Sequence, residues 1–248
     1  SYFMDTLNAG FRNGEEYPLE CLVALLNSRL INCWFSSHFR ATTVAGEHLA
    51  SIPVRQIERG SAREDSRQIA RRLTEQVVSM APQAILPYAK EFFGQMPELA
   101  RVMILYEALC WLAHQMGDLN QTKNAQQKGF LGWLSSNLGI RARTGEHGGI
   151  DSLVGVSRLR NYLGDYEKNE DALSFDDLWA VLLENRARIS RALDPTFEEQ
   201  VRARYMQSLE GLLPIKRRLA ITDPLIDKFV YLLYDLEEED IAFIEAEA

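Results

Sequence analysis

The sequence predicts a mainly α-helical protein that has a small extended, α+β portion near its N-terminus. Two observations predict this fold class. Apolar residues recur at i, i+3, i+4 and i+7 in most segments after residue 18, which is the spacing of one buried helix face. Segments that favour extended structure are few and lie at residues 2–7 and 49–54, where Pro53 biases Ile52 away from helix.

Start and stop signals define the helices expected before residue 140. Ser61 and Glu64 have the spacing of a capping box, in which each side chain bonds the other residue's backbone N–H. Gly117 and Asp118 interrupt a long apolar stripe and predict a disturbed helix at that point. The expected helices cover residues 19–26, 30–39, 61–80, a short segment around 92–93, 97–116 and a stretch around 130–134.

The second half of the chain begins with a loop, because four glycines fall within residues 139–151. We expect Pro214 to kink or end a helix that starts near Pro195, and Thr222 to cap another helix with Pro224 just inside it. The expected helices cover residues 153–163, 174–193, 195–213, 224–233 and a last acidic segment around 241–244. Residues 1–57 and 61–248 are predicted to be separate units.

The composition is that of an ordinary globular protein, with 46% apolar and 25% charged residues in 248. The sequence has no signal peptide and no apolar run of about 18 residues, so we expect no membrane span and a cytoplasmic location. The cysteines Cys21, Cys33 and Cys110 lack Cys-x-x-Cys spacing and are expected to be free buried thiols. The start at Ser1, without an initiator methionine, suggests an excised fragment, and a processed terminus would look the same.

The net charge of −8 is concentrated at the C-terminal end of the chain. Residues 221–248 carry one basic and nine acidic groups, whereas residues 61–145 carry ten basic groups against seven acidic ones. Contact with phosphate needs only a local basic surface. The charge balance therefore neither supports nor excludes binding to nucleic acid.

Motifs for catalysis and metal binding are missing from the sequence. It has no Gly-x-Ser-x-Gly elbow, no P-loop and no dinucleotide fingerprint, and its four histidines lie far apart. Paired carboxylates fall at predicted helix starts, where the helix dipole favours negative charge. These pairs are Asp176-Asp177, Glu198-Glu199 and the run from Glu237 to Asp240. We predict no catalytic residue and no metal ligand in this chain.

Two segments near the ends of the chain carry specific motifs. The first runs from Leu25-Leu26-Asn27-Ser28-Arg29-Leu30 through Trp34-Phe35 to Leu49-Ala50-Ser51-Ile52-Pro53-Val54. The second runs from Thr222-Asp223-Pro224-Leu225-Ile226-Asp227 through Phe229-Val230-Tyr231 to Leu233-Tyr234, Leu236 and Glu238-Glu239. Together they resemble motifs of TaqI-like adenine DNA methyltransferases, a group that includes Type IIG restriction–modification proteins. The family usually has Gly where this chain has Asp235, and Thr where it has Glu237.

The resemblance implies that residues 1–57 end a DNA target-recognition region and that residues 61–248 form a C-terminal helical domain. The family's Asn-Pro-Pro-aromatic motif and its glycine-rich S-adenosylmethionine motif lie upstream of this region and are absent here. We therefore expect no cofactor in this chain and S-adenosylmethionine in the parent enzyme, whose upstream methyltransferase domain would flip a base and methylate adenine N6. Whether an endonuclease is fused to the parent stays open.

Double-stranded DNA is the partner that the resemblance implies, bound through the parent enzyme. Guanidinium and hydroxyl groups suit contacts to phosphate or guanine, and a solvated loop is the plain alternative for each. The candidates in the loop after the second helix, and beside it, are Arg29, Arg40, Thr42, Thr43 and His48, and those in the glycine-rich loop are Arg141 and Arg143. The alternative function is a helical scaffold without DNA contact, which the acidic C-terminal end favours.

Overall fold

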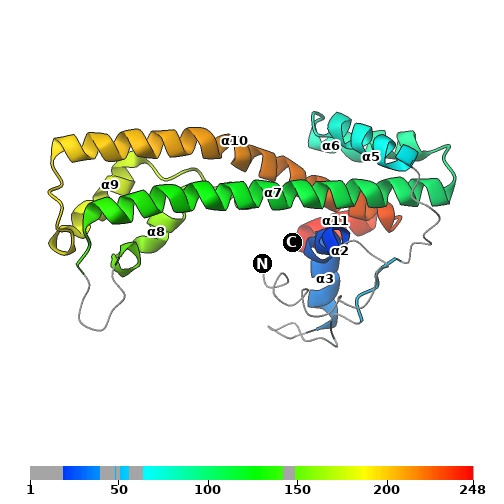
Figure 1. Cartoon of the computed structure of the whole chain (residues 1–248). Helices are drawn as coiled ribbons and strands as arrows, with labels where there is room; N and C mark the ends of the chain where they lie inside the picture. The colour runs from blue at the N-terminus through cyan, green and yellow to red at the C-terminus, as the bar shows by residue number, and fades with distance from the viewer. Residues whose placement is uncertain (1–18, 40–47, 49–50, 56–63, 142–148, 248) are drawn as a thin grey trace. The chain divides into compact units, whose positions relative to one another are not determined.

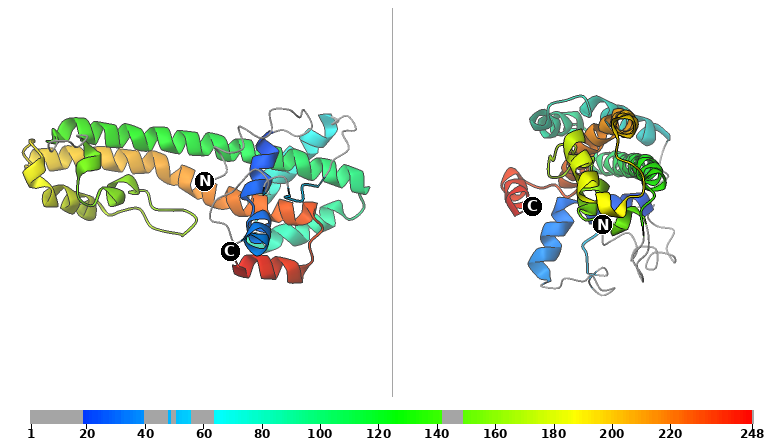
Figure 2. Two further views of the ribbon diagram at one scale, coloured as in Figure 1. Left: turned by 90° about the horizontal axis from the view of Figure 1, so that it is seen from below. Right: turned by 90° about the vertical axis from the view of Figure 1, so that its left-hand side faces the viewer.

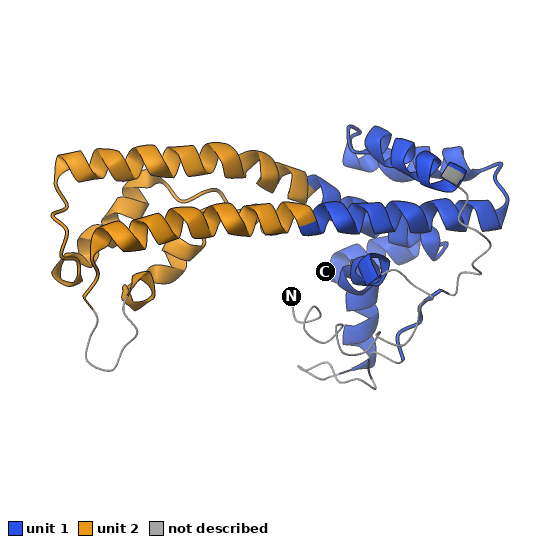
Figure 3. Cartoon of the chain, in the orientation of Figure 1, with its two compact units in different colours: residues 1–117, 221–248 blue, residues 118–220 orange. Residues whose placement is uncertain are grey.

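A computed structural model describes residues 19–39, 48, 51–55, 64–141 and 149–247 (Figure 1). These residues belong to two compact units, one made of residues 1–117 and 221–248 and the other of residues 118–220 (Figure 3). In the described ranges there are nine α-helices, two short 3-10 helices and no strand, which confirms the mainly α prediction. The predicted N-terminal strand and the predicted boundary between residues 57 and 61 lie outside the described residues.

The first unit, whose helices Figure 2 shows from two further sides, has one large apolar core and two smaller apolar clusters. It contains α2 (Leu19–Asn27), α3 (Arg29–His38), α5 (Glu64–Val77), α6 (Pro82–Phe93), the first part of α7 (Glu98–Leu138), the last part of α10 (Pro195–Leu233) and α11 (Glu238–Glu247). Fully buried side chains come from elements far apart in sequence, including Leu73, Leu105, Leu109 and Phe229. The predicted stripe of α2, Leu19, Leu22, Val23 and Leu26, is buried only in part, since Leu19 is exposed and Val23 is half-buried, while Cys21, Ala24 and Leu25 are buried as well. In α3 only Ile31 is fully buried.

Ser28 is the residue that divides α2 from α3. Its backbone is extended, its hydroxyl donates to the Leu25 carbonyl at 2.6 Å, and its Oγ accepts from the Ile31 N–H at 3.4 Å. This is the N-cap arrangement, which satisfies one of the free N–H groups at the start of a helix. The Asn-Ser pair therefore turns the chain at the place where the sequence predicts the break between two helices.

The second unit has its own apolar core, which we call the aromatic core because six rings pack in it among leucine, valine and isoleucine side chains: Phe130, Tyr162, Phe175, Trp179, Phe197 and Tyr205. The elements that contribute to it are the second part of α7, a 3-10 turn at Ile150–Ser152, α8 (Val156–Arg160), α9 (Phe175–Glu184), a 3-10 turn at Arg186–Arg188 and the first part of α10. Two core hydroxyls are satisfied, because Tyr162 Oη lies 2.6 Å from Ser208 Oγ and Tyr205 Oη donates to the Leu173 carbonyl. Burial raises the pKa of Tyr205 to about 12.

Asn185 orders the segment between the 3-10 turn and α8. Its side chain is buried, donates from Nδ2 to the carbonyls of Val154 and Val181, and accepts the Val154 N–H on Oδ1 at 2.9 Å. A buried amide that makes three hydrogen bonds avoids the cost of an unsatisfied polar group. The end of α9 is thus fixed to the Val154 backbone by one side chain.

The predicted interruptions of two helices are wrong. Helix α7 continues through Gly117 and Asp118, and α10 continues through Pro214 and through residues 222–224. A glycine inside a helix costs about 1 kcal/mol and a proline about 3 kcal/mol, and buried side chains on both sides outweigh these local costs. In α10 these are Leu212, Leu219, Leu225 and Phe229. The local signals instead mark where the two units divide, after Gly117 and before Ile221.

A tight loop at residues 161–173 requires glycine at position 164. Gly164 has φ +72°, and a Cβ added there would lie 2.3 Å from the Asp171 carbonyl oxygen and 2.7 Å from the Glu170 carbonyl oxygen. Lys216 Nζ donates to the Leu163 carbonyl at 2.7 Å and also to the Glu170 carbonyl. Burial lowers the pKa of Lys216, while nearby carboxylates oppose that change.

We expect Gly164→Ala to lower the free energy of unfolding by at least about 2 kcal/mol, because the new methyl group meets two backbone carbonyls at a left-handed position. Gly132→Ala is the matched control in the same unit, since it lies inside α7 with no atom within 4 Å of its added Cβ. The control gains up to about 1 kcal/mol from helix propensity. Urea unfolding of both variants measures the difference, and equal stabilities would contradict the predicted clash.

Candidate nucleic-acid interface

Arg29, the first residue of α3, is tied to α10 by Asp227. The Arg29 N–H donates to Asp227 Oδ1 at 2.8 Å, and Arg29 Nε lies 3.3 Å from Asp227 Oδ2. Asp227 thus accepts a free N–H of the first turn of α3 and places negative charge at its positive end. Part of the Arg29 guanidinium is therefore engaged within the protein, although 48% of the side chain is exposed.

Asp227 is a buried carboxylate, with 8% of the residue exposed. Burial raises its pKa to about 6, and the charges of Asp223 and Glu245 act in the same direction. The backbone hydrogen bond and the charge of Arg29 lower the pKa but do not cancel the effect of burial. The group therefore titrates at mildly acidic pH, well above an ordinary aspartate.

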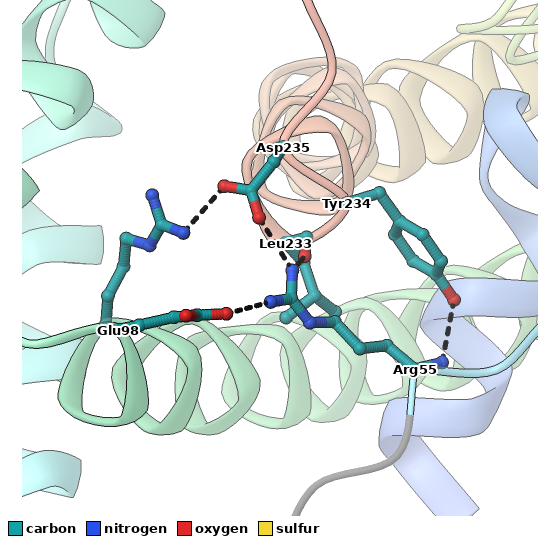
Figure 4. Close-up of polar contacts among 6 residues, drawn as sticks. Arg55, Glu98, Leu233, Tyr234 and Asp235 are labelled. Atoms are coloured by element: carbon teal, nitrogen blue, oxygen red, sulfur yellow. Dashed lines mark hydrogen bonds and ion pairs between the residues drawn. The ribbon is translucent and has the colours of Figure 1, made fainter.

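A second polar cluster surrounds Arg55 (Figure 4). Arg55 Nη1 donates to the Leu233 carbonyl and lies 2.9 Å from Asp235 Oδ2, and Arg55 Nη2 lies 2.7 Å from Glu98 Oε1. Arg101 Nη2 lies 2.6 Å from the other oxygen of Asp235. The Arg55 guanidinium therefore joins the start of α7 to the C-terminal end of α10.

Tyr234 completes the same junction from the end of α10. Its hydroxyl donates to the Pro53 carbonyl at 2.8 Å and accepts the Arg55 N–H at 3.3 Å. Residues 53–55 and 233–235 are thus held together by both backbone and side-chain bonds. We call the contacts among Pro53, Arg55, Glu98, Arg101, Leu233, Tyr234 and Asp235 the Arg55 junction.

Asp235 ends α10 in a left-handed conformation, with φ +53°. The Leu236 N–H donates to the Tyr231 carbonyl at 3.0 Å, which closes the helix end. Aspartate tolerates this conformation better than most residues other than glycine. Asp235 therefore closes the helix in the left-handed conformation, and its carboxylate bonds two arginines.

The C-terminal end of α3 carries a cluster of half-exposed rings that includes His48. The ring centroids of Phe39 and His48 are 4.4 Å apart, and those of Trp34 and His38 are 4.4 Å apart. Phe35 lies within ring contact of both Phe39 and His48. The candidate residues Arg40, Thr42 and Thr43 lie outside the described residues, so their DNA contacts stay a prediction.

Arg141 lies in an antiparallel bridge that the sequence did not predict. Ile140 pairs with Ile189, and the Arg141 N–H donates to the Arg188 carbonyl at 2.9 Å. Arg143 lies outside the described residues. The bridge brings Arg141 close to a segment that contains three further arginines, Arg186, Arg188 and Arg191. They were not grouped with Arg141 from the sequence, because they lie about 45 positions later in the chain.

The described parts of the chain contain no group of three or more His, Cys, Asp or Glu side chains that is placed to hold a metal ion. None of the described helices is both long enough and apolar enough to cross a bilayer. Comparison of the chain with family models, curated proteins and solved structures found no match.

We expect Asp227→Asn to change how stability depends on pH. In the native chain the folded state holds the Asp227 proton more tightly than the unfolded state does. The contribution of Asp227 to the free energy of unfolding therefore falls as pH rises from about 4 to about 6 and stays low above that range. Asparagine can still accept the Arg29 N–H but cannot ionise. The stability of the variant relative to the native chain should therefore rise between pH 4 and pH 7, by up to about 3 kcal/mol at 1.4 kcal/mol per pKa unit.

Chemical unfolding at several pH values measures this difference. Glu75→Gln is the matched control, because the Glu75 carboxylate is exposed on α5 and pairs with the exposed Arg71 four residues earlier. A parallel pH dependence for Asp227→Asn and the native chain would rule out the assigned titration.

Proposed function

We propose that this chain is the non-catalytic C-terminal region of a site-specific adenine-N6 DNA methyltransferase of a restriction–modification system. In this proposal it supports the DNA target-recognition region and contributes to the recognition of double-stranded DNA. The upstream methyltransferase domain of the parent enzyme supplies the methyl-transfer chemistry and binds S-adenosylmethionine. The chain itself holds no cofactor.

One observation carries the proposal, which is that the two segments with the family's motifs pack against each other. They are separated by about 170 residues, yet Arg29 pairs with Asp227 and residues 53–55 pair with residues 233–235 in the Arg55 junction. A chance match of two short motifs gives no reason for them to meet in space. Mutual contact is the expected result when both belong to one structural unit of the resembled family.

A second candidate function is a helical scaffold that makes no direct contact with DNA. It is favoured by the acidic residues of α11 and by the engagement of Arg29 and Arg55 in ion pairs within the protein. Under this function the Arg55 junction would brace a neighbouring domain. Binding of DNA by the chain distinguishes the two candidates.

Methyl transfer by the full reading frame that contains this chain tests the main proposal. We expect incubation with a DNA duplex library and labelled S-adenosylmethionine to place label on adenine N6 within one recognised sequence. Arg55→Gln should raise the KM for DNA at least about tenfold, equivalent to about 1.4 kcal/mol, because it releases the segment that ends the recognition region.

Arg71→Gln is the control for that assay, since Arg71 is an exposed arginine of α5 whose ion pair is with Glu75 in the next turn. Its KM for DNA should match that of the native enzyme. Absence of methyl transfer from the full reading frame would overturn the proposed function, and equal effects of the two variants would overturn the role of the Arg55 junction in it.

A further inference from the structure

We propose that Arg141, Arg186 and Arg191 form, with Arg188, a surface that binds the phosphate backbone of duplex DNA. This inference rests on the proposed function and deepens it, because it assigns DNA contact to the second unit. The surface lies at the bridge between residues 139–141 and 188–191, and we call it the arginine ladder. All four of its residues are described by the structure.

The bridge brings the two segments of the arginine ladder together. Ile140 and Ile189 pair directly and both pack into the aromatic core. Arg141 and the residue opposite it, Arg188, flank this pair; Arg141 is exposed, and Arg188, the last residue of a 3-10 turn, is half-buried. The backbone bonds continue on the other side of the pair, where the Ser190 N–H donates to the Gly139 carbonyl at 3.1 Å and the Arg191 N–H to the Leu138 carbonyl at 3.2 Å.

Like charges directly opposite each other on paired backbones are unfavourable. The Arg188 guanidinium is turned aside to donate to the Ser152 carbonyl, whereas Arg141, Arg186 and Arg191 are exposed. Within the described residues, these three guanidiniums form no ion pair with a carboxylate. Arg191 lies over the Phe197 ring, with its guanidinium carbon 5.0 Å from the ring centroid.

Several other arginines of the same unit are neutralised by nearby acids. Arg158 pairs with Asp177 at 3.2 Å, Arg160 with Asp151, and Arg202 with Glu198 at 3.1 Å. Asp194, which follows Arg191 in the chain, accepts the Phe197 N–H at the start of α10 on Oδ1 at 2.9 Å. Among the residues that the structure describes, positive charge without a carboxylate partner is therefore gathered at the bridge.

The chemistry of the ladder favours phosphate over an acidic peptide. Each guanidinium presents a planar fork of donors that matches a phosphate group, and several such groups gathered at one bridge suit a polyanion. The apolar side chains of the bridge, Ile140 and Ile189, pack inward and are not presented to a peptide. The phosphates of a duplex supply the negative charge that pairs with these guanidiniums.

Fluorescence anisotropy of the full 248-residue chain with a 30-base-pair duplex tests the ladder over a salt series. We expect the affinity to fall with salt, and Arg141→Gln/Arg186→Gln/Arg191→Gln to weaken binding at least about tenfold at low salt. The slope of log K against log salt should decrease by about 2 to 3, at roughly 0.9 for each phosphate that the variant no longer neutralises. The matched control Arg158→Gln/Arg160→Gln/Arg202→Gln removes the same charge from ion-paired positions and should keep most of the slope.

The lysine variant Arg141→Lys/Arg186→Lys/Arg191→Lys keeps the charge and should keep the slope, which separates the removal of charge from damage to the fold. Equal slopes for the ladder variant and its control would overturn this inference, while methyl transfer by the full reading frame would leave the proposed function standing. Absence of DNA binding, with ladder-dependent binding to polyglutamate instead, would also overturn it and assign the surface to an acidic protein partner. Ladder-dependent DNA binding without methyl transfer would support the inference alone.

Discussion

Two carboxylates near the end of α10, those of Asp227 and Asp235, fix the positions of α3 and of residues 53–55 in the first unit. Asp227 accepts the first N–H of α3 and pairs with Arg29, and Asp235 bonds Arg55 and Arg101. Apolar burial supplies most of the stability of such a core but is not directional. Charge-assisted hydrogen bonds are directional, so these pairs fix which residue of α10 meets which residue of the preceding segments. The packing of α2, α3 and residues 53–55 depends on that register.

The sequence predicts the helices well where one signal is enough. The break between α2 and α3 at Asn27 and Ser28 and the start of a helix next to Ser174 are marked by local features, and both appear in the structure as predicted. The signals failed at Gly117, Pro214 and Pro224, where tertiary burial on both sides of a breaker exceeds its local cost. A window of a few residues carries no information on tertiary burial, so it cannot compare the stability gained from burial with the local cost of a glycine or proline.

The candidate site was predicted only in part, for a related reason. Arg29, His48 and Arg141 were named from their loops, but their partners lie on other elements. The ion pair of Arg29 depends on a residue 198 positions later, and the neighbours of Arg141 depend on a bridge to residue 189. No periodic pattern marks such pairings. The arginines at 186, 188 and 191 gave one available signal, three basic residues in six positions without an acid, which goes unnoticed unless the bridge is known.

The turn at Asp235 has a consequence for substitution at this position. A glycine there would relax the backbone, which already has φ +53°, but would release both Arg55 and Arg101 from their shared counterion. The bond from Tyr234 to the Pro53 carbonyl would survive, because it uses a main-chain acceptor that any residue provides. Arg55 would keep its bonds to Glu98 and to the Leu233 carbonyl, so the loss of the Asp235 carboxylate would fall mainly on Arg101.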